Sequence, residues 1–417
     1  MRRSVLANPK PFLPLANPLP KRKYFPMKSM LFPKHHSPSV LCVTIVILVF
    51  ILGRFSSSCQ SQSFLIGGFG EGISASALAS DGSMLAPKLL VEQVRPAFFT
   101  FHPKLDIVYC VTESMRNDAK APSAITAYRF GRPADTNQMP TLTLLNSLKL
   151  DSDIPCHVSI DADGEFLVMS NYTSGSVVVC PVAADGSIKA ASDNVQHKGT
   201  GAYAGKEPRA HCSAWDPSNR YVFVADLGLD RVLVYEMDRA KGKLRPAKNP
   251  EMVLPAGSGP RHIAIHPNKK WVYVINETAL TMTAAFWDAS AGLLKELQTT
   301  TTLPADTKRD GFSTAEVLVH PSGRFVYGSN RGHDTIASFL VDETTGKLSP
   351  IGHTSTNGKT PRNFRIAPDG AFLLAENQQS DSVVSFTIDL ESGKLKSTGF
   401  SIQAMAPACI KFVPERK

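Results

Sequence analysis

The stretch "GSGPRHIAIHPNKKWVYVINE", residues 257–277, decides the fold. Two apolar alternating runs, HIAI and WVYVI, are separated by the turn residues PNKK, which is typical of two adjacent antiparallel strands. Arg261 and His262 stand at the start of this unit and Glu277 stands at its end. Antiparallel neighbours bring the start of the first strand and the end of the second to the same end of a sheet. We therefore expect the basic pair and the carboxylate to lie together.

The same unit recurs along the chain. Complete copies begin at residues 96, 155, 209, 260, 314 and 361, roughly 45–60 residues apart, which is the spacing of propeller blades. Each copy contains four short strand-like runs separated by turn residues. Residues 407–414 supply only a first strand, and residues 63–94 supply the other three. Because the two ends would complete a seventh blade and remove the open sheet edges, the sequence predicts an all-β, seven-bladed propeller over residues 63–417.

The positions equivalent to the opening trio are polar in most repeats. They are His157 with Asn171 and Tyr172, His211 with Asp226, Glu316 with Asn330 and Arg331, and Arg362 and Asn363 with Glu376 and Asn377. We expect these side chains to ring one mouth of the central channel, whereas the turns at the other end carry ordinary turn residues. A concave, polar mouth of this kind predicts a ligand site. A purely structural ring of ion pairs is the alternative.

The N-terminal region differs from the rest of the chain. Residues 1–54 contain nine Lys and Arg residues and no acid, which leaves 36 basic and 36 acidic residues for the remainder. A neutral body gives no reason to expect a nucleic-acid partner. Residues 1–39 are basic and proline-rich, and we expect them to be disordered. Residues 40–54 include the uncharged run "VLCVTIVILVFILG" and are expected to be a signal peptide or signal anchor. We expect an exported or membrane-anchored protein on the periplasmic side, or a cytoplasmic one if this segment is not a functional signal.

Several classes of chemistry have no motif in this sequence. No GxSxG, HExxH, P-loop or strand-linked GxGxxG motif is present. The seven cysteines form no CxxC pair and most sit singly in apolar runs, so we expect buried, unpaired thiols. No Cys/His cluster has the spacing of a metal site. We expect no metal and no cofactor, and any catalysis must use His, Glu and Arg side chains.

Four stretches resemble a known family. "GSGPRHIAIHP", "VINE", "SNRGHD" and "GKTPRNFRIAPDGAFLLAENQ" look like the lactonase family of seven-bladed propellers, which includes propeller-type 6-phosphogluconolactonases and 3-carboxy-cis,cis-muconate lactonizing enzymes. The resemblance implies one His, one Glu and two Arg at the channel mouth. By motif, the catalytic residues would be His211, Glu277, Arg261 and Arg331. Among the other polar residues, we expect the following to bind substrate: His157, Arg209, His262, Asn330, Arg362 and Asn363. The family's usual Pro-His-Ala-His is "PRAH" here, with Arg209 in place of the first His.

The resemblance implies hydrolysis of a phosphorylated or carboxylated sugar lactone, first of all 6-phosphogluconolactone. Arg261 and Arg331 would hold the anionic group, and one of them could stabilise the oxyanion. Either Glu277 or His211 would be the general base, and His211 the acid to the ring oxygen. Dense positive charge is expected to lower the pKa of Glu277. The small anionic lactone would be the partner of a monomer, with membrane association through residues 40–53. The alternatives are a carboxymuconate cyclase and a non-enzymatic extracytoplasmic binding module.

Overall fold

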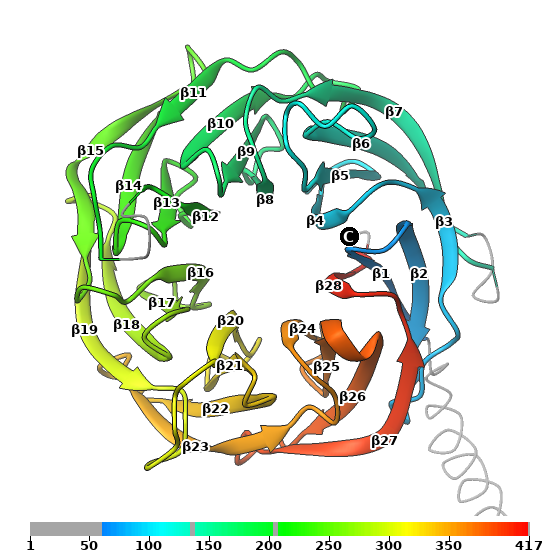
Figure 1. Cartoon of the computed structure of the whole chain (residues 1–417), viewed down its shortest axis with the longest axis vertical. Helices are drawn as coiled ribbons and strands as arrows, with labels where there is room; N and C mark the ends of the chain where they lie inside the picture. Colours follow the sequence, from blue (N-terminus) through cyan, green and yellow to red (C-terminus); the bar gives the residue numbers. More distant parts are fainter. Residues whose placement is uncertain (1–60, 134–137, 203–206, 416–417) are drawn as a thin grey trace, which may run out of the picture. The chain divides into compact units, whose positions relative to one another are not determined.

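The protein is described from a computed structural model that covers residues 61–133, 138–202 and 207–415. In these residues 28 strands form seven four-stranded antiparallel sheets. The sheets stand in a ring around a central axis as the blades of a propeller (Figure 1). The predicted all-β, seven-bladed propeller is therefore confirmed. The segment 40–54 and the rest of the N-terminal region lie outside the described residues.

Six blades are built from consecutive strands, with the first strand of each blade beside the channel. Blade 1 contains β4 (Pro96–Phe101), β5 (Ile107–Thr112), β6 (Ala124–Gly131) and β7 (Thr141–Lys149); blade 2 contains β8 (Pro155–Ile160), β9 (Phe166–Asn171), β10 (Ser176–Pro181) and β11 (Asp193–Gln196). Blade 3 contains β12 (Ala210–Trp215), β13 (Tyr221–Asp226), β14 (Arg231–Asp238) and β15 (Lys243–Val253); blade 4 contains β16 (Pro260–Ile265), β17 (Trp271–Asn276), β18 (Thr281–Asp288) and β19 (Leu293–Thr301). Blade 5 contains β20 (Ser313–Val319), β21 (Phe325–Arg331), β22 (Thr335–Val341) and β23 (Leu348–Ser355); blade 6 contains β24 (Pro361–Ile366), β25 (Phe372–Asn377), β26 (Ser382–Ile388) and β27 (Leu395–Gln403), with the short 3₁₀ helix η1 (Gln378–Ser380) between β25 and β26.

The seventh blade joins the two ends of the described chain. Its inner strand is β28 (Pro407–Phe412), and its other strands are β1 (Gln62–Gly68), β2 (Gly72–Leu78) and β3 (Lys88–Glu92). β28 pairs antiparallel with β1 from Phe64↔Phe412 to Gly68↔Pro407. Figure 1 places the red β28 beside the blue β1. The predicted closure is thus confirmed, and it leaves no inner strand unpaired.

The hydrophobic core lies between neighbouring blades. Every residue of β5, β9, β13, β17 and β25 is buried, because these second strands are covered on both faces by the adjoining sheets. The β17 sequence WVYVIN shows how a continuous apolar run fits that position. The fourth strands alternate between exposed and partly buried residues, since they face solvent on the outside of the ring. The apolar contacts therefore fix the order and spacing of the blades.

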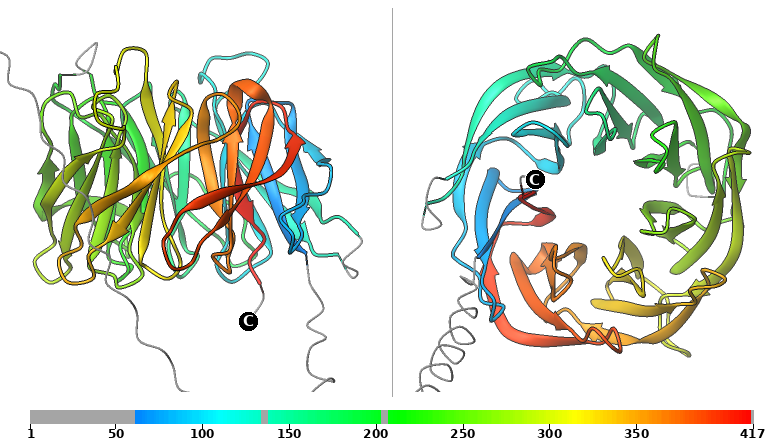
Figure 2. Two further views of the ribbon diagram at one scale, coloured as in Figure 1. Left: turned by 90° about the horizontal axis from the view of Figure 1, so that it is seen from below. Right: turned by 180° about the vertical axis from the view of Figure 1, so that it is seen from behind.

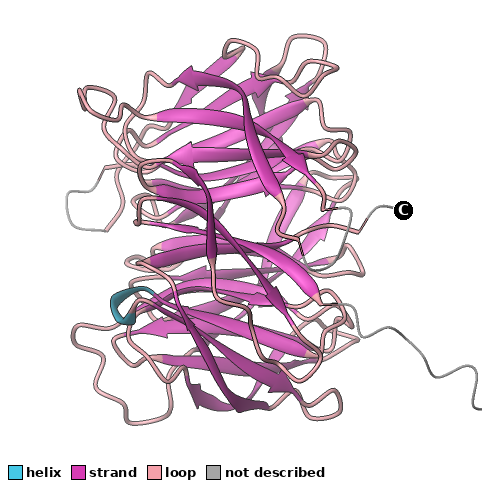
Figure 3. Cartoon of the chain, turned by 90° about the vertical axis from the view of Figure 1, so that its right-hand side faces the viewer, coloured by secondary structure: helices cyan, strands magenta, loops and turns pink. Residues whose placement is uncertain are grey.

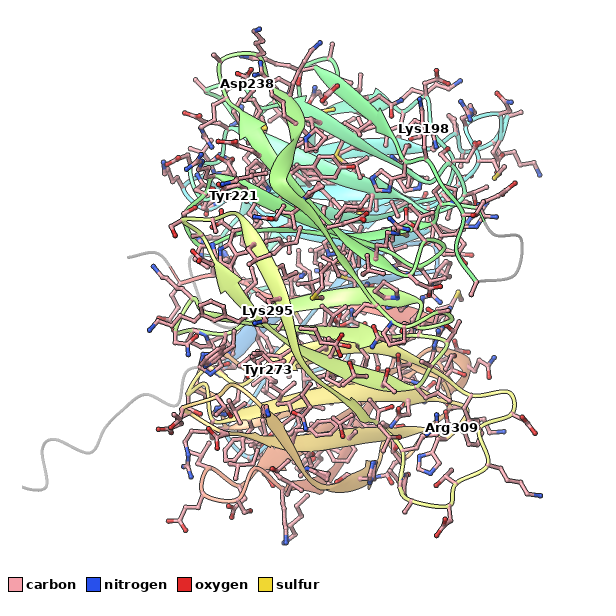
Figure 4. The ribbon with its side chains drawn as sticks, turned by 90° about the vertical axis from the view of Figure 1, so that its left-hand side faces the viewer. Lys198, Tyr221, Asp238, Tyr273, Lys295 and Arg309 are labelled. Carbon is pink, nitrogen blue, oxygen red and sulfur yellow. The ribbon has the colours of Figure 1, made fainter. Side chains whose placement is uncertain are left out.

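Side-chain hydrogen bonds between neighbouring blades add to this packing. Three tyrosines on second strands each donate a hydrogen bond to a glycine carbonyl in the next blade: Tyr109 to Gly186 at 2.8 Å, Tyr273 to Gly346 at 3.0 Å and Tyr327 to Gly393 at 2.9 Å. Tyr273 is labelled in Figure 4. His320 joins its turn to Gly370 of the next blade at 2.9 Å. A Cβ at Gly370 would lie 2.6 Å from His320 Nε2, so only glycine fits there.

The strands run through the thickness of the propeller, and the loops gather at its two faces (Figures 2 and 3). The loops that connect one blade to the next lie on the same face as the ends of the second strands. Figure 4 places Lys198 and Arg309, which belong to such loops, opposite Asp238 at a turn between third and fourth strands. Asp230 braces one of these loops by accepting from the N–H groups of Gly257 and Gly259. Gly259 O in turn accepts from Glu277 N at 2.7 Å, so the brace reaches the channel mouth.

Candidate active site

A β-bulge at the start of each inner strand organises the channel mouth. In blade 4, Pro260 pairs with Asn276 and His262 with Ile275, so Arg261 is the extra residue. Blades 1, 2, 3 and 6 shift register at the same place, at Ala97, Cys156, His211 and Arg362. Bulges re-aim side chains. In blades 4 and 6 two adjacent residues were both predicted to lie at the mouth. The bulge leaves the first of them, Arg261 or Arg362, at the mouth and places the second, His262 or Asn363, deeper in the channel.

We call six residues at the mouth the rim cluster: Glu113, His211, Arg261, Glu277, Arg331 and Arg362. Glu277 is its centre. Its Oε2 lies 2.9 Å from Arg261 Nε and 2.9 Å from Arg331 Nη2. Arg261 also donates to Ala315 O at 2.8 Å, and Arg331 donates to Thr314 O at 2.9 Å. The structure therefore brings together Arg261, Glu277 and Arg331 from blades 4 and 5, as the strand argument predicted.

Charge balance keeps Glu277 ionised. Burial would raise the pKa of Glu277, but the positive charges of Arg331, Arg261 and Arg362 outweigh burial and lower it. Burial lowers the pKa of Arg331 to about 10, against the opposing charge of Glu277. Both partners thus remain charged at neutral pH. An ionised carboxylate with a lowered pKa is a weak general base.

Arg362 differs from the other two arginines. It forms no ion pair or side-chain hydrogen bond with any residue that the structure describes. Its guanidinium lies 5.0 Å from the centre of the Phe69 ring. Burial, and then the charge of Arg261, lower the pKa of Arg362. The donors of this third cation are available to an anion at the channel mouth.

Glu113 is a member of the rim cluster that the sequence analysis missed. It follows β5 directly, as Glu277 follows β17, because Thr112 and Asn276 close their ladders at equivalent positions. Burial raises the pKa of Glu113, although Arg362, Arg261 and Arg95 oppose that change. Two carboxyl groups in equivalent positions therefore have oppositely shifted pKa values. The register of "VTES" against "VINE" was the signal that could have identified Glu113.

His211 occupies the bulge of blade 3. Its Nδ1 lies 3.9 Å from Cys156 Sγ, and its ring stands edge-on to Tyr172 with centroids 5.6 Å apart. Burial, followed by the charges of Arg261, His262 and Arg362, holds the pKa of His211 well below its usual range. Burial also raises the pKa of the Cys156 thiol. His211 is consequently a neutral imidazole at neutral pH, and its Nε2 forms no hydrogen bond within the described residues.

Six residues one step deeper form what we call the mid-channel layer: Phe98, His157, Cys212, His262, Glu316 and Asn363. The expectation that His262 meets Glu277 is wrong, because the bulge turns His262 toward Glu316, with Nδ1 2.9 Å from Oε1. Glu316 Oε2 accepts from Asn363 at 2.6 Å, and its Oε1 accepts from Val317 N. His157 Nε2 lies 3.5 Å from Cys212 Sγ. His157, His262 and Asn363 thus sit below the rim cluster.

The remaining predicted binding residues have structural contacts. Asn330 is fully buried and donates to Thr302 O at 2.9 Å. Arg209 pairs with Glu207 at 3.1 Å, and its guanidinium lies 5.6 Å from the Tyr172 ring centre.

The five cysteines of the described residues are buried and unpaired, as expected. No group of three or more His, Cys, Asp or Glu side chains in the described ranges is placed to hold a metal ion.

Fold and site together define a seven-bladed propeller with an arginine-bound carboxylate at one channel mouth. Residues 57–412 match the family described as lactonase, 7-bladed β-propeller. The chain therefore belongs to this family. It is 33% identical over 299 residues to a 6-phosphogluconolactonase of Bacillus subtilis, covering 71% of this chain and 81% of that protein. A 6-phosphogluconolactonase of Formosa agariphila is 33% identical over 66% of this chain and 75% of its own length.

Solved structures agree with this assignment. The periplasmic gluconolactonase of Pseudomonas aeruginosa superposes with a TM-score of 0.79 at 28% identity, covering 85% of this chain and 99% of that one. A putative 6-phosphogluconolactonase of Bacteroides fragilis superposes with a TM-score of 0.77 at 28% identity, covering 86% and 99%. The similarity therefore extends over the whole propeller.

Glu316 gives a prediction about stability and pH. Burial alone would raise its pKa, but His262 and the Val317 N–H outweigh burial and lower it to about 2. A lowered pKa stabilises the fold above the unfolded value near 4.5, and that contribution is lost as the pH falls toward 2. We expect Glu316→Gln to lower the free energy of unfolding by about 3 kcal/mol at pH 7. In urea unfolding, the loss of unfolding free energy caused by Glu316→Gln should become smaller below pH 4.5. The exposed control Glu343→Gln should leave the free energy of unfolding unchanged at both pH values. A deficit independent of pH would contradict this account.

Proposed function

We propose that the protein hydrolyses an anionic sugar lactone at the rim cluster, with 6-phosphogluconolactone as the first candidate. The observation that carries this proposal is the surplus of positive charge at one channel mouth, where three arginines surround one ionised carboxylate. The proposal is supported by relatives named 6-phosphogluconolactonase. An anionic substituent on the lactone would balance that surplus.

Arg362 is the arginine that we propose as the anchor for the phosphate or carboxylate of the substrate. Arg261 and Arg331, first expected to hold that group, already share Glu277 and each donate to a backbone carbonyl. Arg331 retains a buried Nε without a hydrogen-bond partner among the described residues. We assign to Arg331 the stabilisation of the oxyanion that forms when water adds to the lactone carbonyl. Arg261 then fixes Glu277 and, through it, the position of Arg331.

His211 is our choice as general base, because its Nε2 forms no hydrogen bond within the described residues, whereas Glu277 is held by two arginines. Water attacks the carbonyl carbon, and His211 Nε2 takes its proton while the carbonyl oxygen becomes the oxyanion. The tetrahedral intermediate collapses with cleavage of the bond to the ring oxygen. The imidazolium returns the proton to that oxygen, which leaves a hydroxyl and a carboxylic acid in the open-chain product. The acid then releases its proton to solvent and becomes the carboxylate. Glu277 balances the charges of Arg261 and Arg331.

Replacing Arg362 tests the anchor. Arg362→Met should raise KM for 6-phosphogluconolactone by roughly 10–100-fold, since a charge-assisted contact contributes about 1.5–3 kcal/mol. KM for uncharged gluconolactone should change little, and kcat should stay within about threefold for both. Arg220→Met is the matched control, because Arg220 is exposed and pairs with Glu236 away from the channel. Equal losses for both lactones would remove Arg362 from phosphate recognition.

Steady-state kinetics also test the base. His211→Ala should lower kcat about 10²–10⁴-fold, whereas His353→Ala on the outer strand β23 should not, although burial lowers the pKa of His353 as well. The kcat/KM profile should be flat from pH 6.5 to 8, because the pKa of His211 lies well below 6.5 and the base is therefore deprotonated throughout. Undiminished hydrolysis in both His211→Ala and Glu277→Gln would refute this site.

Two other functions fit the same mouth. A carboxymuconate-type cyclase would need the same anion recognition, and a non-enzymatic module could bind a sugar acid without turnover. A panel of phosphorylated, carboxylated and uncharged lactones separates these functions, because only the hydrolase produces acid from the phosphorylated lactone.

We also propose that the propeller acts as a monomer, without nucleic acid.

We further propose that residues 40–53 direct the propeller across, or anchor it to, a membrane. The described residues contain no helix long and apolar enough to span a bilayer. One structural relative is named periplasmic. The full chain should fractionate with the membrane or the extracytoplasmic space, and a variant lacking residues 40–53 should stay in the cytoplasm. Cytoplasmic recovery of both would overturn this proposal.

A further inference from the structure

A cavity lies in the channel between residues of the mid-channel layer and the mouth opposite the rim cluster. It has a volume of about 230 Å³, and we call it the lower pocket. Its polar lining is His157, Cys212, His262, Glu316, Arg365 and Lys411, and Phe98 forms part of its wall. It extends to the exposed Pro267 at the turn between β16 and β17. The lower pocket therefore faces the opposite mouth from the rim cluster.

Strand alternation explains the charge of this pocket. After each bulge, side chains two residues apart point into the channel, so the position below the mid-channel layer is held by Thr100, Ser159, Ala214, Ala264, Leu318, Arg365 and Lys411. Five of these residues are uncharged. Arg365 and Lys411 belong to β24 and β28, which are neighbours around the channel (Figure 1). Both cations thus enter the pocket from one side.

Neither cation has a partner of opposite charge. Within the described residues, Arg365 and Lys411 form no ion pair and no side-chain hydrogen bond. The Lys411 ammonium lies 4.6 Å from the centre of the Phe98 ring. Glu316 is the carboxylate that lines the pocket, and it already accepts from His262, Asn363 and the Val317 N–H. Partly buried cations without a partner are costly unless a counter-ion joins them.

The carboxyl group behind the pocket does not supply that counter-ion. Glu376 is fully buried in β25. Burial, followed by the negative charge of Glu316, raises the pKa of Glu376 well above its usual range, which favours its uncharged form. Burial, followed by the charge of Arg365, lowers the pKa of Lys411 to about 8, and Lys411 is still mostly protonated at pH 7. The lower pocket therefore holds more positive than negative charge.

We propose that the lower pocket is a second anion-binding site, in which Arg365 and Lys411 together bind a small phosphate or carboxylate. Arg365 supplies the planar donor pair suited to an oxyanion, and Lys411 supplies a compact charge beside it. The mid-channel layer separates this site from the rim cluster. The proposal does not depend on the lactone chosen for the rim cluster, since it concerns different residues at the other end of the channel.

Binding of inorganic phosphate to the full-length protein tests the proposal. Calorimetric titration at pH 7 and low ionic strength should detect two phosphate sites in the wild type. Arg362→Met should retain the lower one, and Lys411→Met or Arg365→Met should weaken it at least tenfold. Lys347→Met, an exposed lysine in the turn between β22 and β23, is the matched control. A parallel titration with acetate establishes whether carboxylates share the site. If the Lys411 and Arg365 variants bind phosphate as the wild type does, the proposal is overturned.

A second measurement needs no substitution in the channel. Reductive methylation at pH 7 should modify Lys411, because a lowered pKa leaves part of its side chain as free amine. The exposed Lys347 serves as the reference. Phosphate should slow methylation of Lys411 severalfold and leave Lys347 unaffected, as followed by peptide mass spectrometry. Methylation of Lys411 that does not respond to phosphate would overturn the proposal even if the Lys411→Met protein failed to fold.

Discussion

The pairing of β28 with β1 is the contact on which the channel depends. It closes the ring with strands from opposite ends of the described chain, so all seven inner strands are held around one axis. Closure also sets the neighbours of β28, which are β24 on one side and β4 on the other. Lys411 thereby comes to lie beside Arg365 and over Phe98. Without this pairing the inner strands that carry the rim cluster would no longer be held in a closed ring. The lower pocket would also lose Lys411, one of its two cations.

The bulge is the second constraint, and it acts on chemistry more than on stability. One extra residue per inner strand turns Arg261 to the mouth and His262 to the next layer. The same shift separates Arg362 from Asn363 in blade 6. Two functional layers thus come from adjacent residues of one strand. The layers stay in contact through histidines, since the ring centres of His211 and His262 are 5.3 Å apart.

The channel carries two pairs of carboxyl groups with oppositely shifted pKa values. At the mouth, arginines lower the pKa of Glu277, while burial raises that of Glu113. Deeper in, His262 lowers the pKa of Glu316, and burial raises that of Glu376. Such divergence lets carboxyl groups take different roles at one pH. Glu277 and Glu316, the carboxyl groups with lowered pKa, are already paired with side chains of the protein. The surplus of positive charge therefore faces the open channel.

The sequence predicted the architecture well, because alternation and repetition are local signals that seven copies reinforce. It also placed Arg261, Glu277 and Arg331 together through strand direction alone. It could not foresee the bulges, and it therefore put His262, His157 and Asn363 at the mouth. Asn330 was grouped with the mouth residues because its position is polar, yet its side-chain amide donates a hydrogen bond to the Thr302 carbonyl. Polarity at a strand end does not distinguish a ligand contact from a satisfied backbone group.

Lys411 shows where sequence reasoning stops. The fragment "PACIKFVP" identified an inner strand, but a single lysine in it carries no sign of its surroundings. Its low pKa depends on burial and on Arg365, a residue that lies 46 positions earlier. Those conditions exist only once the ring is closed and the alternation of both strands is fixed. The positive charge of the lower pocket is therefore a property of the assembled propeller, and the same argument applies to the uncompensated charge of Arg362 at the mouth.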